Sequence, residues 1–224
     1  MKKLGKTIAH IPARAGSKRI KLKNMRELCG KPLILYAINA ALHSEILDEI
    51  YVNTDSDEIA EFAIKSGVKV YRRSSHLASD TATSDEFNMD IINSLNPDTL
   101  VMINPVCPII DSSDIDDIVN AYNNMNVDTL ITSSEEAMQC FYNDDPVNVI
   151  LNEQLAPTQN NKPVHICNWA VTIWDAKKFK ERYDRNGYAV FGDKRKLFPI
   201  GKFKSIKISV EEDFQFAEMV LKKT

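Results

Sequence analysis

The sequence predicts an α/β fold, a mostly parallel sheet covered by helices and formed by a single domain over residues 1–224. Two observations predict this class. Apolar, β-branched runs alternate from the start with segments whose apolar residues recur at helical spacing, and this alternation is typical of βα units around a parallel sheet. In addition, Thr99–Ile103 is a short, largely apolar run of the kind found in strands at the centre of a sheet.

The first half carries the elements in regular order. Pro32 suits the first turn of a helix, Gly67 suits a helix end, and Asp111 begins a segment with N-capping chemistry. In chain order we expect a strand at 7–13, a helix at 32–43, a strand at 49–53, a helix at 56–65 and a strand at 68–71. A helix at about 84–94, a strand at Thr99–Ile103, a helix at 111–123 and a strand at 128–132 follow.

The pattern changes after about residue 138. Residues 143–159 contain two strand-like pieces separated by turn residues, and 164–174 is long and β-rich, so we expect an antiparallel, β-rich insertion at about 140–174. A helix at 176–183, a turn at Asn186-Gly187, a strand at 203–208 and a final helix at 211–222 complete the prediction.

Composition excludes several classes of function. The 28 Lys and Arg residues against 31 Asp and Glu residues give a net charge of −3, which lacks the electrostatic footprint of a nucleic-acid-binding protein. No apolar run reaches membrane-spanning length, and the N-terminal apolar stretch is too short for a signal peptide. We expect a cytoplasmic protein with neither nucleic acid nor a membrane as partner. The four cysteines, Cys107 among them, form no CxxC pair and are expected to be reduced thiols.

A basic loop follows the first strand. Residues 14–24 carry five cationic side chains around a Gly-Ser step, at the carboxyl end of a strand, where open α/β sheets bind ligands. Gly16 would let backbone N–H groups approach oxygen atoms, and Arg and Lys side chains would neutralise a triphosphate and its leaving pyrophosphate. The loop matches neither the P-loop spacing nor G-x-G-x-x-G.

Several motifs then resemble one family. The stretch IPARAGSKRIKLKN, followed by GKPLILYAINAA, is similar to the signature of the CMP-sugar synthetases, cytidylyltransferases that activate sialic acid and related nonulosonic acids. Residues 52–60 resemble V-S-T-D-x-x-x-I-A, residues 73–82 resemble R-P-x-x-L-A-x-D-x-A, and residues 210–218 resemble T-E-E-D-F…A-E. The resemblance implies a Rossmann-like nucleotidyltransferase domain of the GT-A-like kind, and a homodimer in which the β-rich insertion reaches the partner.

The resemblance also implies a reaction. A hydroxyl group of a sugar acid would attack the α-phosphorus of CTP and release pyrophosphate, with Mg²⁺ as cofactor. The positions implied for the nucleotide are Ala13, Arg14, Gly16, Ser17, Lys18, Lys23, Asn24, Arg73 and Ser84, of which Arg14, Lys18 and Lys23, with Lys207, are the catalytic candidates. Asn104 and Gln159 are implied for the acceptor. Arg73 could instead be a surface charge, and Ser84 a helix N-cap.

The metal motif departs from the family pattern. Where the family has I-D-I-D-T-E-E-D, this chain has IKISVEED, so Lys207 and Ser209 replace two aspartates that look like Mg²⁺ ligands. Lys207 could take over part of the charge of the metal, or the metal could be held by the triphosphate, water and Asp213. For Glu211, Glu212 and Asp213 we favour an acidic first turn of the last helix.

The acceptor motifs depart as well. Residues 104–108 read NPVCP in place of Q-P-T-S-P, and residues 157–161 read PTQNN where the family has arginines that suit an acidic sugar. A phosphorylated or neutral acceptor, and a non-catalytic nucleotide-binding relative, therefore stay open as alternatives. For Ile166, Trp169, Val171 and Ile173, a dimer contact and internal packing are both open.

Overall fold

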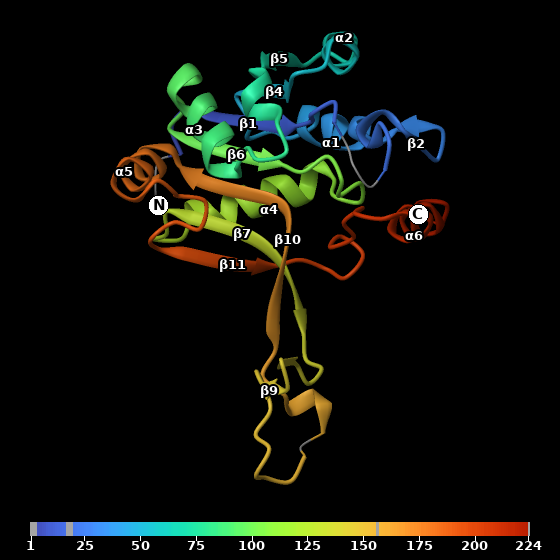
Figure 1. Cartoon of the computed structure of the whole chain (residues 1–224), viewed down its shortest axis with the longest axis vertical. Helices are drawn as coiled ribbons and strands as arrows, with labels where there is room; N and C mark the ends of the chain where they lie inside the picture. The colour runs from blue at the N-terminus through green and yellow to red at the C-terminus, as the bar shows by residue number, and fades with distance from the viewer. Residues whose placement is uncertain (1–3, 17–19, 156, 224) are drawn as a thin grey trace.

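One seven-stranded sheet organises the chain (Figure 1). The computed structural model describes residues 4–16, 20–155 and 157–223. The order of the strands across the sheet is β11 (Arg195–Pro199), β7 (Thr129–Glu136), β10 (Val164–Asp175), β6 (Thr99–Ile103), β1 (Thr7–Pro12), β4 (Glu49–Thr54) and β5 (Lys69–Arg72). Of these strands, only β10 runs antiparallel to its neighbours, β6 and β7. The predicted α/β class with a mostly parallel sheet is confirmed.

Helices cover both faces of the sheet. They are α1 (Leu33–Leu42), α2 (Asp57–Lys65), α3 (Ser84–Leu95), α4 (Ser112–Asn123), α5 (Ala176–Asn186) and α6 (Glu211–Leu221). Thr83 and Asp111 form capping boxes with Glu86 and Asp114, which fixes where α3 and α4 begin. Gly187, with a φ of 78°, ends α5 in the left-handed region that favours glycine.

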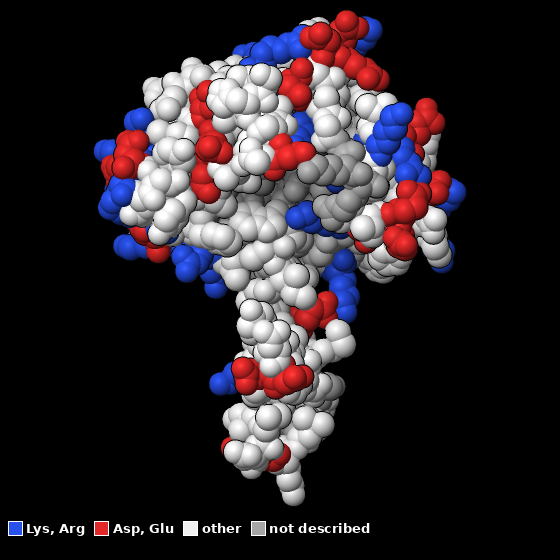
Figure 2. All heavy atoms as spheres, viewed as in Figure 1, with Lys and Arg blue, Asp and Glu red and all other residues white. Residues whose placement is uncertain are grey.

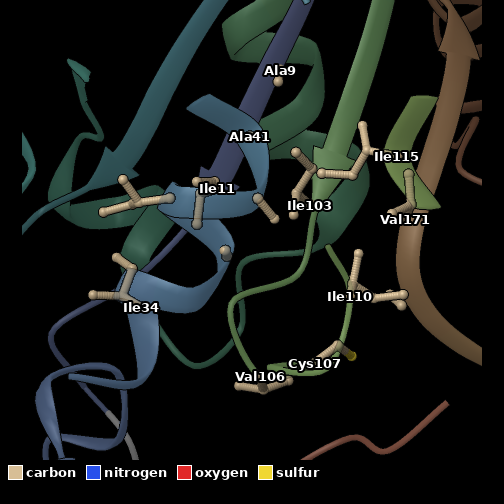
Figure 3. Packing of buried hydrophobic residues seen from close by; sticks show 14 of the residues in the cluster. Ala9, Ile11, Ile34, Ala41, Ile103, Val106, Cys107, Ile110, Ile115 and Val171 are labelled. Atoms are coloured by element: carbon tan, nitrogen blue, oxygen red, sulfur yellow. The ribbon is translucent and has the colours of Figure 1, made fainter. Parts of the chain in front are cut away.

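The core forms two clusters, one on each face of the sheet. In the larger cluster, side chains of α1 and α4 pack on the central strands, and Figure 3 shows Ile34 and Ile115 among its residues, together with Ile11, Ile103 and Val171. The smaller cluster packs α3 and α5 against the other face, around the fully buried Trp174. Among the described residues, every helix is too short or too polar to cross a lipid bilayer.

Strands β7 and β10 continue past the sheet into an arm, residues 137–155 and 157–163, which projects away from the body of the molecule (Figure 1). The arm contains a small hairpin of β8 (Phe141–Tyr142) and β9 (Asp145–Pro146), and a 3-10 turn at Thr158–Asn160. Figure 2 shows that its visible surface is mostly uncharged. The expected insertion is present, but its strands are few: among the described residues of 143–159, only β9 is a strand.

One predicted strand is corrected, and one strand was missed. No strand forms at 203–208; the edge position beside β7 is taken by β11, whose charged residues hide it in the sequence. Ile206 and Ile208 are buried and alternate with Lys207, but this extended segment packs on the loop after β6, where Ile208 N donates to Val106 O at 2.8 Å. Residues 203–208 therefore include the alternating burial that is typical of a strand, but the predicted strand in the sheet is wrong.

The outcome for the residues proposed to line a dimer contact is divided. Val171 and Ile173 are fully buried in the core, so internal packing holds for both. Ile166 is 54% exposed where β10 enters the arm. Trp169 is half-buried and faces a pocket described below.

Candidate functional site

Two pockets adjoin at the carboxyl end of β1. Because β1 runs parallel to both β4 and β6, the loops after these strands gather at one edge of the sheet. The first, the basic pocket, has a volume of about 400 Å³ and is lined by the loop after β1 and by residues facing it, including Pro12, Arg14, Gly16, Lys23, Asn24, Asp80 and Asn104. The structure thus brings together four residues predicted to bind a nucleotide: Arg14, Gly16, Lys23 and Asn24.

Backbone geometry fixes the two ends of the basic loop. Ala13 N donates to Asn53 O at 2.9 Å, and Ala15 N donates to a carboxylate oxygen of Asp55 at 2.9 Å, which tie the start of the loop to β4 and the residues after it. At its other end, Leu22 adopts a φ of 50° and its carbonyl accepts from Met25 N and Arg26 N. This turn presents the side chains that follow Leu22 to the pocket.

Lys23 and Asn24 lie at the inner wall of the basic pocket. Lys23 Nζ donates to Ile208 O at 3.1 Å, and so connects the loop after β1 with the segment before α6. Asn24 is buried and its Nδ2 donates to Arg14 O at 3.4 Å. Lys23 is therefore held from a region distant in the sequence, and Asn24 from the start of its own loop.

Arg14 bridges two loops. Its Nη1 donates to Ala78 O and Ser79 O at 3.2 and 3.0 Å, and its Nη2 lies 2.9 Å from a carboxylate oxygen of Asp80. An anion entering the basic pocket would therefore compete with Asp80 for this guanidinium group. Ser17 and Lys18, both predicted to bind the nucleotide, lie outside the described residues.

Gly16 is not required by the packing of the protein. A Cβ atom built on it would meet no heavy atom within 4 Å among the residues that the structure describes. The space beside its backbone is open, so the reason for glycine here, as the sequence predicts, would be the approach of a ligand.

Arg73 does not reach the basic pocket. It is only 7% exposed, its Nε donates to Asn53 Oδ1 at 2.8 Å, and its guanidinium lies 4.5 Å from the ring centre of Phe87. Burial, opposed by the charge of Asp55 and assisted by that of Arg14, lowers the pKa of Arg73 to about 10. Arg73 is thus neither a surface charge nor a residue that lines the basic pocket. It is a buried residue that contacts Asn53 of β4 and Phe87 of α3.

The second pocket, the aromatic pocket, has a volume of about 610 Å³. It shares Pro12 and Asn104 with the basic pocket. Ser84 and Lys207 face it, and five aromatic residues contribute to its wall: Phe87, Trp169, Trp174, Tyr188 and Phe191. Ser84 is therefore placed here as the first residue of α3, whose N-cap is Thr83.

An irregularity in β10 aims Trp169 into the aromatic pocket. The pairing of β10 with β7 shifts between Cys167 and Thr172, and Trp169 has a φ of 61°, which a bulky residue rarely adopts. Asn168 holds the irregularity: its Oδ1 accepts from Thr132 Oγ1 at 2.7 Å and from Ala170 N at 3.0 Å, and its Nδ2 donates to Ser205 Oγ. This strained position next to a pocket points to a functional surface.

A second contact fixes the opposite wall. Asp85 Oδ1 accepts from Val190 N at 2.8 Å and also from Ala189 N. The turn after α5 is thereby attached to α3, and its Phe191 ring packs edge-on against Trp169, with ring centres 5.3 Å apart. Sequence reasoning missed Asp85 and Asn168, because their roles depend on partners 105 and 37 residues away.

The two positions implied for magnesium ligands carry no carboxylate. Lys207 and Ser209 occupy these positions, and among the described residues there is no group of three or more His, Cys, Asp or Glu side chains suited to a metal. The carboxylate of Asp213 accepts from Ser209 N and Val210 N at 2.7 and 3.0 Å, and so serves the start of α6. Glu211 pairs with Arg26. The favoured interpretation of this acidic first turn is supported.

The two residues implied for the acceptor are separated. Asn104 lies between the two pockets, whereas Gln159 lies on the 3-10 turn of the arm and lines neither of them. The prediction that Gln159 joins this acceptor site is not supported within one chain, because the insertion extends outward instead of folding over the sheet (Figure 1).

An α/β sheet with a basic pocket after its first strand and a second pocket directly against it defines a protein of the nucleotidyltransferase fold. A family model described as cytidylyltransferase matches residues 8–217. The chain belongs to this family, and the resemblance to CMP-sugar synthetases is confirmed.

Individual relatives agree. An N-acylneuraminate cytidylyltransferase of Streptococcus agalactiae serotype V is 28% identical over 218 residues, 93% of this chain and 52% of that protein, so the chain spans about half its length. A CMP-N,N'-diacetyllegionaminic acid synthase of Legionella pneumophila is 42% identical over 107 residues, 45% of this chain and 46% of that protein. The solved structure of a CMP:2-keto-3-deoxy-manno-octonic acid synthetase complexed with CTP shares the fold, with a TM-score of 0.73 at 14% identity, over 97% of this chain and 99% of that one.

Proposed function

We propose that this protein transfers CMP from CTP to a sugar acid and releases pyrophosphate. The observation that carries the proposal is the shared wall of the two pockets. Pro12 and Asn104 line both, so a nucleotide in one pocket and an acceptor in the other would meet at these residues. In such transfers the protein contributes mainly positioning and charge neutralisation, which two fixed, adjoining pockets provide.

The basic pocket is the proposed site of CTP. Arg14 and Lys23 line it from opposite ends of the loop, and both are held by hydrogen bonds to carbonyl groups, which can be exchanged for phosphate oxygens. The open space beside Gly16 suits close approach of a phosphate to the backbone. Ser17 and Lys18 are expected to contribute from the same loop.

The aromatic pocket is the proposed site of the acceptor. Its volume of about 610 Å³ is in the range of small-molecule sites, and aromatic faces suit the C–H surfaces of a sugar and its acyl groups. Tyr188 and Phe191 are 57% and 51% exposed at this pocket, so a ligand would cover apolar surface there. Relatives named for N-acylneuraminate and N,N'-diacetyllegionaminic acid support a sugar acid as the substrate class.

A non-catalytic nucleotide-binding protein is the second candidate, and the absence of fitting magnesium ligands among the described residues favours it. An active enzyme would use Mg²⁺ that arrives with CTP, or would work with an altered metal requirement.

We also propose a homodimer joined through the arm. Large apolar side chains on the arm are between 51% and 73% exposed, which is costly for a surface that stays in water; they are Met138, Phe141, Tyr142, Val147, Ile150, Leu151 and Leu155. A second copy of the chain offers the same arm as a matching apolar surface.

The deciding experiment measures CTP-dependent pyrophosphate release with N-acetylneuraminic acid, N,N'-diacetyllegionaminic acid, and phosphorylated and neutral sugars, each with and without Mg²⁺ and Mn²⁺. Release with a sugar acid supports the proposal. Release only with a phosphorylated or neutral sugar would replace the substrate class, and CTP binding without any turnover would support the non-catalytic alternative.

A further inference from the structure

Lys207 is a cation without a partner at the wall of the aromatic pocket. It is half-buried, and it forms no hydrogen bond or ion pair with any residue that the structure describes. Nearby cations differ: Lys204 pairs with Asp111 and Asp114, and Arg26 pairs with Glu211. A charge that is partly removed from water and left unpaired is unfavourable, so the position suits an anion that arrives with a ligand.

The pocket itself does not neutralise Lys207. Asp85 is the other charged residue in its wall, and Asp85 Oδ1 already accepts from the backbone N–H groups of Ala189 and Val190. The thiols that lie within the electrostatic reach of Lys207 are neutral: burial raises the pKa of Cys107 to about 12 and raises that of Cys167, each against a smaller lowering by Lys207.

The backbone on either side fixes the direction of Lys207. Ile206 and Ile208 are buried, and Ile208 is anchored through its N–H to Val106 O and through its carbonyl to Lys23 Nζ. In extended backbone, successive side chains point to opposite sides, so Lys207 faces away from the core and into the pocket. Its position is therefore built into the fold and does not depend on a ligand.

We propose that Lys207 binds the carboxylate of the acceptor sugar acid. The inference rests on the proposed function, and it explains two departures from the family pattern together: the arginines expected for an acidic sugar are missing, and a cation stands where an aspartate would be. A phosphate of CTP is the other anion within the site, but the basic pocket holds its own cations and Lys207 does not line it. Lys207 is thus assigned as a specificity-determining residue and not as a substitute for a metal.

The experiment compares Lys207→Met with the unchanged protein on N,N'-diacetyllegionaminic acid and on the same sugar with its carboxylate converted to a carboxamide. We expect the KM for the acid to rise about tenfold or more, the scale of a lost charge-assisted hydrogen bond, while the KM for the amide stays the same. The Kd of CTP, measured by calorimetry, should not change. Lys207→Arg should recover part of the preference for the acid. Lys196→Met, which removes an exposed charge on β11, is the matched control.

Two outcomes would overturn the inference: an equal loss of both acceptors, or a weaker Kd for CTP with an unchanged KM for the acid, which would assign Lys207 to the nucleotide. If Lys207→Met does not fold, Lys207→Gln is measured in the same way. Failure of the proposed function is distinguishable, because the unchanged protein would then bind CTP and convert no sugar acid. Without a sugar acid as substrate, the assignment of Lys207 to its carboxylate would also be rejected.

Discussion

Asp85, in the first turn of α3, accepts a hydrogen bond from the backbone N–H of Val190, 105 residues later in the chain, at 2.8 Å. This contact, with the second one from Ala189 N, attaches the turn that carries Tyr188 and Phe191 to the body of the protein. The carboxylate of Asp85 thus holds one wall of the aromatic pocket, together with the Trp174 indole N–H, which donates to Val190 O at 2.7 Å.

Replacing Asp85 should loosen that wall. In Asp85→Ala, two backbone N–H groups lose their acceptor, and we expect a loss of about 1–3 kcal/mol in the free energy of unfolding. The KM for the acceptor should rise while the Kd of CTP is retained, because the basic pocket does not contain Asp85. Chemical denaturation and steady-state kinetics measure the two effects. Asp117→Ala, on the exposed side of α4, is the control. Equal weakening of CTP and acceptor would contradict this assignment.

Lys23→Ala and Arg14→Ala should weaken CTP binding by about 1.5–3 kcal/mol each, the range for hydrogen bonds that involve a charged group. Titration calorimetry gives the Kd directly. Lys21→Ala is a matched control, because Lys21 belongs to the same loop, is exposed and does not line the basic pocket. If Lys21→Ala weakens CTP as much as the other two, the binding reflects only the net charge of the loop.

Charged substitutions on the arm should dissociate the proposed dimer. Leu151→Asp places a carboxylate on a side chain that is 62% exposed in one chain and that we expect to be covered by the partner. Sedimentation at micromolar concentration should change from dimer to monomer. Ile64→Asp, at a 64% exposed apolar residue of α2, should leave the dimer intact. A monomeric unchanged protein would refute the arm as an interface.

His10 should make the protein less stable in mild acid. Complete burial, followed by the charge of Arg73, lowers the pKa of His10 to about 3 from an ordinary value of 6.5. As the pH falls below 6.5, His10 binds a proton in the unfolded chain but not in the folded chain. The free energy of unfolding therefore decreases by about 1.4 kcal/mol per pH unit because of this group. Urea unfolding at pH 7.5 and 5 should show this slope, and His10→Gln should reduce it. An unchanged slope in the variant would contradict the prediction.

Restoring carboxylates should create metal affinity. In the double variant Lys207→Asp with Ser209→Asp, two hard oxygen ligands would occupy the positions that the family resemblance implies for Mg²⁺. Calorimetry with Mg²⁺ and Mn²⁺ should detect tighter binding than in the unchanged protein. The single variant Ser209→Asp separates the effect of one carboxylate from that of two. No gain in the double variant would mean that this segment is not positioned for a metal.

Local patterns predicted most of the sheet and its helices, because capping residues and periodic burial act within a few residues. The start of α4 follows from Asp111 and Asp114, and β6 follows from its apolar run. The edge strand β11 was missed because it lacks such a local pattern. It is stabilised by pairing with β7 and not by its own apolar content. Residues 203–208 carry the burial pattern of a strand without its partner.

The candidate site could be predicted only where it is continuous in the sequence. The basic loop places Arg14, Gly16, Lys23 and Asn24 in one pocket, as the sequence predicts. Of the aromatic pocket, only Ser84, Asn104 and Lys207 were predicted as site residues, because the other lining residues come from scattered elements that include α3, β10 and the turn after α5. Trp169 in particular turns toward the pocket only through the irregular pairing of β10 with β7, which depends on the buried Asn168.

Strand β10 is one continuous stretch of 12 residues from the base of the arm, past Trp169, to the centre of the sheet. Residues 164–167 of this strand pair with β7 beside the arm, and the hydrogen bonds of Asn168 hold the irregularity next to Trp169. The arm and the indole ring are therefore joined through a few paired residues of one strand. A chain whose arm is clamped by a second copy should fluctuate less at Trp169 than a free chain, so assembly would also tune the rigidity of the acceptor wall.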